Sequence, residues 1–275
     1  MTRGLMRRRR ALWVAGVLVP LAPAAALLAQ QPSLRIALVP YLPPRALLEV
    51  WEPLRTYLAA ALGERVEMYS APNFRALIES ARARAQDMTL TPVHLGQLLA
   101  REKTAVWIAQ SARRSEVQLL TTLPEGASWE GRRFGTGDPL SILTLIGQRW
   151  LTANGLAGRV TVREAPNPAT LALWLARGEV DAIFISSAQV PDLPALRSIA
   201  ATRAITIDTI LTPGWQVPAD TPEQRRQRLQ EVLLAYRPAD QGTAATAQWL
   251  APDPAQLRRF DALAEAARAV LEARR

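Results

Sequence analysis

The chain has 275 residues, with 33 basic residues, 24 acidic residues and no cysteine. Without cysteine it can form no disulfide, bind no metal through a thiolate and carry no lipid on an N-terminal cysteine. The formal charge of +9 includes five arginines among the first ten residues, so the chain that follows them is near +4. Its arginines are spread along the predicted helices and mixed with acids, whereas a nucleic-acid-binding protein shows a clustered basic face.

Residues 1–29 have the pattern of a secretory signal peptide. The arginine-rich start is followed by an uncharged apolar stretch, 11–29, which ends in small residues. A transmembrane anchor is the alternative, because about 19 apolar residues can nearly cross a bilayer, but Pro20 and Pro23 interrupt the stretch. An arginine pair before it also leaves twin-arginine export open. We therefore predict export, with cleavage near Ala26 or Ala29.

The next residues alternate between strand and helix patterns. The segment 46–62 is predicted to be a helix because its apolar residues recur at spacings of three and four before Gly63. Asn73 is a helix-capping residue, and Pro92 suits the first turn of another helix. Strands are predicted at 34–39, 65–69, 87–90, 105–110 and 117–122, and helices at 46–62, 74–84 and 92–101.

A turn-rich break at 124–131 precedes a second series of the same kind. Strands are predicted at 132–135, 160–163, 180–185, 198–201 and 205–211, and helices at 139–154, 168–177, 222–236, 239–250 and 254–274. Strands separated by helices indicate an α/β fold with mostly parallel sheets flanked by helices. The break predicts two lobes, with residues 33–122 and 205–275 in the first and residues 123–204 in the second. A cleft between two such lobes is a common place for a small ligand.

Five segments together resemble one protein family. They are Leu34-Arg-Ile-Ala-Leu-Val-Pro-Tyr41, Trp51-Glu-Pro-Leu-Arg-Thr-Tyr-Leu58, Asp87-Met-Thr-Leu-Thr-Pro92, Gly135-Thr-Gly-Asp-Pro-Leu-Ser141 and Gly178-Glu-Val-Asp-Ala-Ile-Phe184. Their order and spacing are similar to those of the phosphate-, phosphite- and phosphonate-binding periplasmic proteins of ABC importers. The resemblance implies a type II periplasmic-binding-protein fold, with two α/β lobes, a two-strand hinge and a ligand in the cleft.

The resemblance also implies an anion site at a helix N-terminus, where free N–H groups and the helix dipole attract an oxyanion. The family motif Asp-Pro-x-Ser-Thr-Ser-Gly corresponds here to a segment that begins at Asp138 and contains Ser141. Ile142 and Leu143 replace the next two hydroxyl residues, which removes two donors. Asp138 could instead act only as a helix cap.

Two more positions follow from the same resemblance. Asn167 stands where the family often has a histidine, so it would replace that residue as a donor. Ser186 stands where the family can have a carboxylate that holds a ligand amine, so an aminophosphonate would lose that partner.

Three residues of the first predicted lobe are further candidates. His94, the only histidine, begins a helix after a strand and could donate to an anion, although a surface histidine at a helix start is an equal alternative. Tyr41 and Thr91 each end a strand and could face the cleft, or serve only in the core or in a turn.

We therefore predict a non-enzymatic periplasmic solute-binding protein for a small oxyanion, similar to phosphate or phosphonate, that feeds an ABC importer. One histidine and no cysteine argue against a zinc site, and no nucleophile motif is present. No metal and no cofactor are expected, the partner is a permease, and the protein is expected to be a monomer. The alternative is a periplasmic sensor or accessory protein for a membrane kinase or redox complex.

Overall fold

The computed structural model describes residues 33–199, 202–238 and 248–273. The predicted signal peptide lies outside the described residues, as does most of the helix predicted at 239–250. Residues Ser33–Arg275 form one compact unit of contacts. Among the described helices, none combines the length and the apolar composition that a membrane crossing requires.

The first sheet contains six of the described strands, in the order β11-β4-β10-β3-β1-β2. Its strands are β1 (Ser33–Leu38), β2 (Arg65–Ser70), β3 (Met88–Thr91), β4 (Ala105–Ser111), β10 (Gly214–Pro218) and β11 (Trp249–Leu250). β1 pairs in parallel with β2 and β3, whereas β10 is antiparallel to β3 and β4. The sheet is therefore mixed, because β10 runs antiparallel to both of its neighbours.

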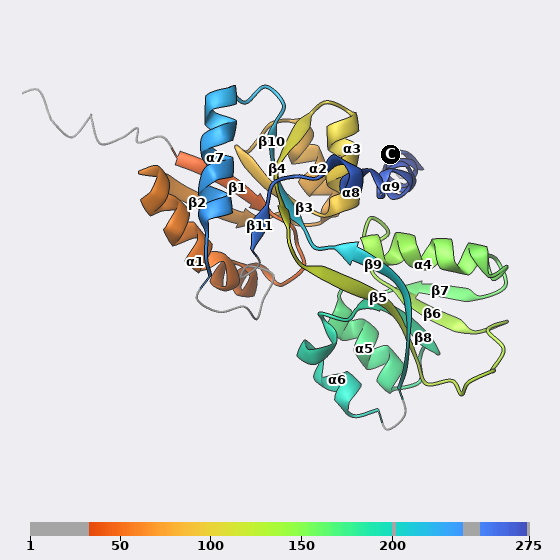
Figure 1. Cartoon of the computed structure of the whole chain (residues 1–275). Helices are drawn as coiled ribbons and strands as arrows, with labels where there is room; N and C mark the ends of the chain where they lie inside the picture. The colour runs from red at the N-terminus through yellow and green to blue at the C-terminus, as the bar shows by residue number, and fades with distance from the viewer. Residues whose placement is uncertain (1–32, 200–201, 239–247, 274–275) are drawn as a thin grey trace, which may run out of the picture. The chain divides into compact units, whose positions relative to one another are not determined.

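The second sheet contains five of the described strands, in the order β7-β6-β8-β5-β9. They are β5 (Arg114–Thr121), β6 (Arg133–Thr136), β7 (Thr161–Glu164), β8 (Ala182–Ser186) and β9 (Arg203–Leu211). β6 is parallel to β7 and β8, and β5 is antiparallel to β8 and β9. The chain passes from the first sheet to the second between β4 and β5, and returns between β9 and β10 (Figure 1).

Helices connect the strands within each sheet, as Figure 1 shows. They are α1 (Pro44–Leu62), α2 (Phe74–Arg82), α3 (Val93–Arg101), α4 (Ile142–Ala153), α5 (Pro168–Ala176), α6 (Pro194–Arg197), α7 (Glu223–Ala235), α8 (Pro254–Arg258) and α9 (Asp261–Ala273), with a short 3₁₀ turn at Val190–Asp192. α7 packs against α1 and β4, and α9 packs against α3. α7 and α9 thus pack on elements that belong to or flank the first sheet, and α9 also contacts α4.

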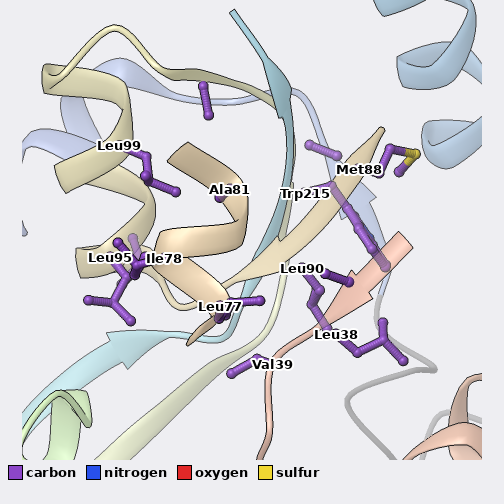
Figure 2. Packing of buried hydrophobic residues seen from close by; sticks show 14 of the residues in the cluster. Leu38, Val39, Leu77, Ile78, Ala81, Met88, Leu90, Leu95, Leu99 and Trp215 are labelled. Atoms are coloured by element: carbon purple, nitrogen blue, oxygen red, sulfur yellow. The ribbon is translucent and has the colours of Figure 1, made fainter. Parts of the chain in front are cut away.

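The apolar side chains that pack around the first sheet are almost completely buried. Leu38 of β1, Leu77 and Ile78 of α2 and Leu95 of α3 are each 0% exposed and belong to one buried cluster, part of which Figure 2 shows. Full burial of each such side chain contributes about 1.5–3 kcal/mol relative to an exposed position. This packing explains how the fold holds without a disulfide.

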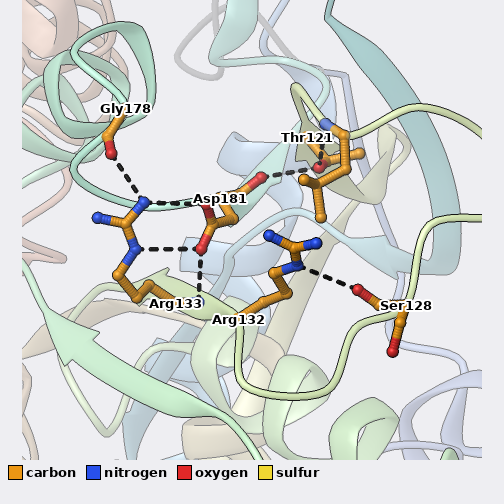
Figure 3. A network of polar contacts seen from close by, with 7 residues as sticks. Thr121, Ser128, Arg132, Arg133, Gly178 and Asp181 are labelled. Atoms are coloured by element: carbon orange, nitrogen blue, oxygen red, sulfur yellow. Dashed lines mark hydrogen bonds and ion pairs between the residues drawn. The ribbon is translucent and has the colours of Figure 1, made fainter.

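A polar network joins three strands at one end of the second sheet. The Asp181 carboxylate accepts hydrogen bonds from the Arg133 backbone N–H at 2.8 Å and from its guanidinium at 2.9 Å (Figure 3). Thr121 Oγ1 donates to the Asp181 carbonyl at 2.7 Å. The hydrogen bonds from Arg133 lower the pKa of Asp181. Because Asp181 precedes β8, this network lies at the end of the sheet opposite to Ser186 and has a structural role.

Glycines set the distance between two helices and their sheets. A Cβ atom on Gly96 in α3 would lie 2.2 Å from the Trp107 ring of β4, and one on Gly147 in α4 would lie 2.5 Å from the Phe184 ring of β8. Neither distance is possible without movement, so α3 and α4 are each held close to their own sheet.

Replacing Gly96 by alanine should therefore destabilise the protein. Overpacking in a dense core costs about 1–3 kcal/mol, and the higher helix propensity of alanine offsets up to about 1 kcal/mol of that cost. Denaturant unfolding of Gly96→Ala measures the difference. Gly137→Ala is the control, since the nearest atom to its added Cβ is 3.9 Å away; equal loss in both variants would contradict the packing argument.

The predicted α/β fold class is confirmed, and nine predicted strands appear among the described residues. Eight of them lie within two residues of their predicted bounds, and the strand predicted at 117–122 begins three residues earlier, at Arg114. Other elements differ from the prediction. Gly214–Pro218 forms a strand that was not predicted, Trp249–Leu250 is a strand where a helix was predicted, and the long C-terminal helix is divided near Phe260. The strand predicted at 198–201 lies partly outside the described residues, and its described part is not a strand.

Candidate functional site

A tight turn at the end of β6 leads into α4. The Asp138 carboxylate accepts from the Leu140 N–H at 2.7 Å, and the Asp138 carbonyl accepts from the Ser141 N–H at 2.8 Å. The helix was predicted to begin at Pro139 but begins at Ile142, with Ser141 as its N-cap residue. Asp138 therefore orders the turn and does not cap α4.

The N-terminus of α4 has no side-chain cap. Ser141 occupies the N-cap position, yet its side chain makes no capping hydrogen bond. The first N–H groups of a helix lack partners within the helix, so those of Ile142 and Leu143 point out of its first turn. Their partial positive charge makes this terminus suited to a negatively charged group.

His94 joins the first turn of α3 to this same turn. Its Nε2 lies 2.9 Å from the Leu140 carbonyl oxygen, and the side chain is 0% exposed. Because a carbonyl only accepts, Nε2 carries the proton of the neutral ring. Nδ1 is buried with no hydrogen-bond partner. Burial lowers the pKa of His94 to about 4, so the ring is neutral at pH 7.

Thr91 and Tyr41 occupy strand ends on the first sheet. Thr91 is buried at the end of β3, where its hydroxyl makes only a long 3.5 Å contact with the Thr89 carbonyl. Tyr41 is partly buried and packs edge to face on Phe74, with 5.8 Å between ring centroids. Burial raises the pKa of Tyr41, so its hydroxyl stays protonated and can donate.

Asn167 and Ser186 make local contacts on the second sheet. The Asn167 side chain is exposed and caps α5, accepting from the Thr170 N–H at 2.9 Å. Ser186 Oγ at the end of β8 lies 2.5 Å from Ser115 Oγ. Both polar groups are thus already occupied, and their roles in ligand binding stay predictions.

Two other polar groups near the turn were not predicted from the sequence. Thr144 lies in the first turn of α4, and its buried hydroxyl has no hydrogen-bond partner. Thr144 follows Ser141 by three residues, and residues at this spacing lie on the same side of a helix. The spacing could therefore have indicated that Thr144 lies beside Ser141. The second group is the Leu140 carbonyl, a backbone atom that no side-chain pattern reveals.

Apart from the Asp138 carboxylate, which accepts from the Leu140 N–H, the groups placed around the turn are neutral polar groups and apolar side chains. His94, Ser141 and Thr144 are buried, and so are Leu140 and Ile142 of the same turn. Thr91 is also buried, at the end of β3, and its place in the site stays a prediction. In the described part of the chain, no three His, Asp or Glu residues are grouped to hold a metal ion. The arrangement can therefore bind through N–H and O–H donors and a helix terminus.

A family model covers most of the chain. Residues 36–260 match the family described as the periplasmic substrate-binding protein of phosphonate ABC transporters. No curated protein matches the sequence significantly.

Solved structures show the same fold at low sequence identity. XAC2383 of Xanthomonas citri, bound to a chloride ion, is 17% identical with a TM-score of 0.74, covering 87% of this chain and 99% of its own. A binding component of a phosphonate ABC transporter from Pseudomonas aeruginosa is 16% identical with a TM-score of 0.66, covering 88% and 89%. PhnD1 of Prochlorococcus marinus, in complex with methylphosphonate, is 15% identical with a TM-score of 0.69, covering 86% and 98%. The family match over residues 36–260, together with the two-sheet fold, identifies the chain as a member of the periplasmic phosphonate-binding family of ABC transporter substrate-binding proteins.

Proposed function

We propose that the protein binds a small oxyanion, similar to phosphate or a phosphonate, at the N-terminus of α4 and presents it to an ABC permease. The observation that carries this proposal is the missing side-chain cap at Ser141 together with the buried, unpartnered hydroxyl of Thr144 in the same turn. α1, α3 and α7 also lack a side-chain cap, but each of them follows a proline, which has no polar side chain. Asn73 at α2 and Asn167 at α5 each accept from a first-turn N–H. At α4 the corresponding donors stay available for a ligand.

Apart from the Asp138 carboxylate, the groups around the turn are neutral, and we expect them to favour an anion of small size. A buried oxyanion needs several donors to replace its water, and first-turn N–H groups with the Ser141 hydroxyl supply them. Ile142 and Leu143 add no hydroxyl, so we expect phosphonates to bind less tightly than at a site with three hydroxyl residues. The apolar side chains beside the turn fit a ligand with a small apolar substituent, such as the methyl group of the methylphosphonate bound to PhnD1.

We further propose two lobes with a hinge. The two sheets are connected at 111–114 and 211–214, and β5 and β9 both belong to the second sheet. The second lobe would then span about residues 114–211, which is wider than the predicted 123–204. The protein is proposed to act in the periplasm after cleavage of its signal, without lipidation, as a monomer and without catalysis.

Removing the Ser141 hydroxyl should weaken oxyanion binding. A hydrogen bond to a charged group contributes about 1.5–3 kcal/mol, which is about ten- to a hundredfold in affinity. Calorimetry with methylphosphonate and phosphite on Ser141→Ala measures the loss. Ser80→Ala is the control, because Ser80 Oγ donates within α2 to the Leu77 carbonyl at 2.9 Å. Unchanged affinity in Ser141→Ala would remove the turn from the site.

A further inference from the structure

Thr144 in the first turn of α4 has a buried hydroxyl that makes no hydrogen bond within the described part of the chain. The residue is only 2% exposed, and a hydroxyl that is buried without a partner lowers the stability of a protein. Thr152 in the same helix shows the ordinary arrangement, because its hydroxyl donates at 3.0 Å to the Gln148 carbonyl, four residues earlier. Departures from this rule are concentrated at functional sites, so the Thr144 hydroxyl is a candidate donor for a ligand.

The same turn of α4 holds further free donors. The Leu145 N–H bonds to the Ser141 carbonyl at 3.1 Å and begins the hydrogen bonding of the helix. The N–H groups of Ile142, Leu143 and Thr144 precede it and have no acceptor within the helix. The Thr144 hydroxyl therefore belongs to the same group of donors, and it supplies a hydroxyl that Ile142 and Leu143 lack.

Gly137, which follows β6, faces this hydroxyl across a small space. A Cβ atom added to Gly137 would have one neighbour within 4 Å outside the adjacent residues, namely Thr144 Oγ1 at 3.9 Å. The same addition at Gly135 or Gly147 would meet side chains at 2.8 Å or 2.5 Å. Gly137 is also partly exposed, whereas Gly135 and Gly147 are buried. The space between Gly137 and Thr144 Oγ1 is thus a notch that no described side chain fills.

We propose that this notch binds one oxygen of a tetrahedral oxyanion, and that Thr144 thereby determines the class of anion that the protein selects. The first-turn N–H groups and the Ser141 hydroxyl would bind the other oxygens. A carboxylate has only two oxygens, which these donors already bind, whereas phosphite and methylphosphonate have a third oxygen for the notch. This role of Thr144 rests on the proposed function and adds to it a selection between anion classes.

Thr144→Val tests the donor, because valine keeps the branched shape and removes the hydroxyl. The wild type should bind phosphite and methylphosphonate more tightly than acetate. In Thr144→Val the affinity for the first two should fall about ten- to a hundredfold, as expected for one hydrogen bond to a charged group, and any affinity for acetate should stay the same. Thr144→Ser keeps the hydroxyl and should restore most of the affinity. Unchanged binding of methylphosphonate in Thr144→Val, measured by calorimetry, would overturn the proposal.

Thermal unfolding without added anion separates a ligand-binding hydroxyl from a structural one. Thr144→Val removes a buried hydroxyl that has no partner, so its Tm should rise by about 2–4 °C. Thr152→Val is the matched control, because it removes a hydroxyl of the same helix that is already hydrogen-bonded. It should leave the affinity unchanged and should not raise Tm. A lower Tm in Thr144→Val than in Thr152→Val would show that the Thr144 hydroxyl stabilises the fold, and would contradict its role as a free donor.

Gly137→Ala tests the notch itself. Gly137 has no positive φ, so its backbone accepts alanine without strain. An oxygen that accepts from a hydroxyl lies about 2.7–2.8 Å from it, and a methyl carbon only 3.9 Å from Thr144 Oγ1 would exclude such an oxygen from the notch. We expect methylphosphonate affinity to fall at least about tenfold, with Tm unchanged.

The Ser141→Ala measurement shows which of the two proposals fails. Unchanged binding in Ser141→Ala would contradict the proposed function, and the notch with it. Weaker binding in Ser141→Ala, with full methylphosphonate affinity in both Thr144→Val and Gly137→Ala, would leave the site at the start of α4 in place and overturn the notch alone.

Discussion

Replacing Ser141 by aspartate should abolish oxyanion binding while the protein stays at least as stable as the wild type. Aspartate is a favoured N-cap residue, and its carboxylate would accept from the first-turn N–H groups that Ser141 leaves free. The same carboxylate would repel an anionic ligand at close range. We expect affinity for methylphosphonate to fall more than about a hundredfold, or about 3 kcal/mol.

Calorimetry and thermal unfolding of Ser141→Asp measure the two effects together. Ser141→Asn separates their causes, because asparagine caps the helix without adding charge and should weaken binding to an intermediate degree. Normal affinity in Ser141→Asp would show that the ligand does not use this helix terminus. A large loss of stability would instead show that the terminus has no room for a capping side chain.

Acidification should remove about 3 kcal/mol of folding free energy through His94 alone. Burial lowers the pKa of this histidine from 6.5 to about 4 in the folded protein, and each unit corresponds to about 1.4 kcal/mol. Between these values the unfolded chain binds a proton that the folded protein excludes. The contribution is therefore fully present above about pH 6.5 and is lost as the pH falls toward 4.

Denaturant unfolding of the wild type and of His94→Gln across pH 4–7 isolates this contribution. His94 is the only histidine in the chain, so the difference between the two pH profiles belongs to it. Carboxylates whose pKa is lowered, such as Asp181 and Asp253, titrate in both proteins and cancel. Parallel profiles would contradict the burial of a neutral His94.

The fold could be predicted where local pattern and burial agree. The apolar spacing of α1 and the short apolar runs of β1 and β8 depend on residues close in sequence, and all three elements appear. β10 was missed because Gly214 and Pro218 read as turn residues, whereas pairing with β3 and β4 makes this segment a strand. β11 is two residues long and exists through its pairing with Ser111 and Gln110, which no local pattern reports.

The site was predictable only in part, for a related reason. The turn before α4 was found because aspartate, proline and serine mark a helix start, although the helix begins three residues later than predicted. His94 was found as the only histidine, but its acceptor is the Leu140 carbonyl, 46 residues away. α4 also packs on α9 and shares the buried cluster of the first sheet, and this arrangement depends on tertiary packing alone.

The central claim is that the N–H groups at the start of α4 bind an oxyanion, and amide resonances test it most directly. Methylphosphonate can be titrated into the ¹⁵N-labelled protein while the amides of Ile142, Leu143 and Thr144 are followed by NMR. Charge-assisted hydrogen bonds are short and strong, so these amide protons should shift downfield together and saturate with one affinity. Saturable binding that leaves all three amides unmoved would contradict the account.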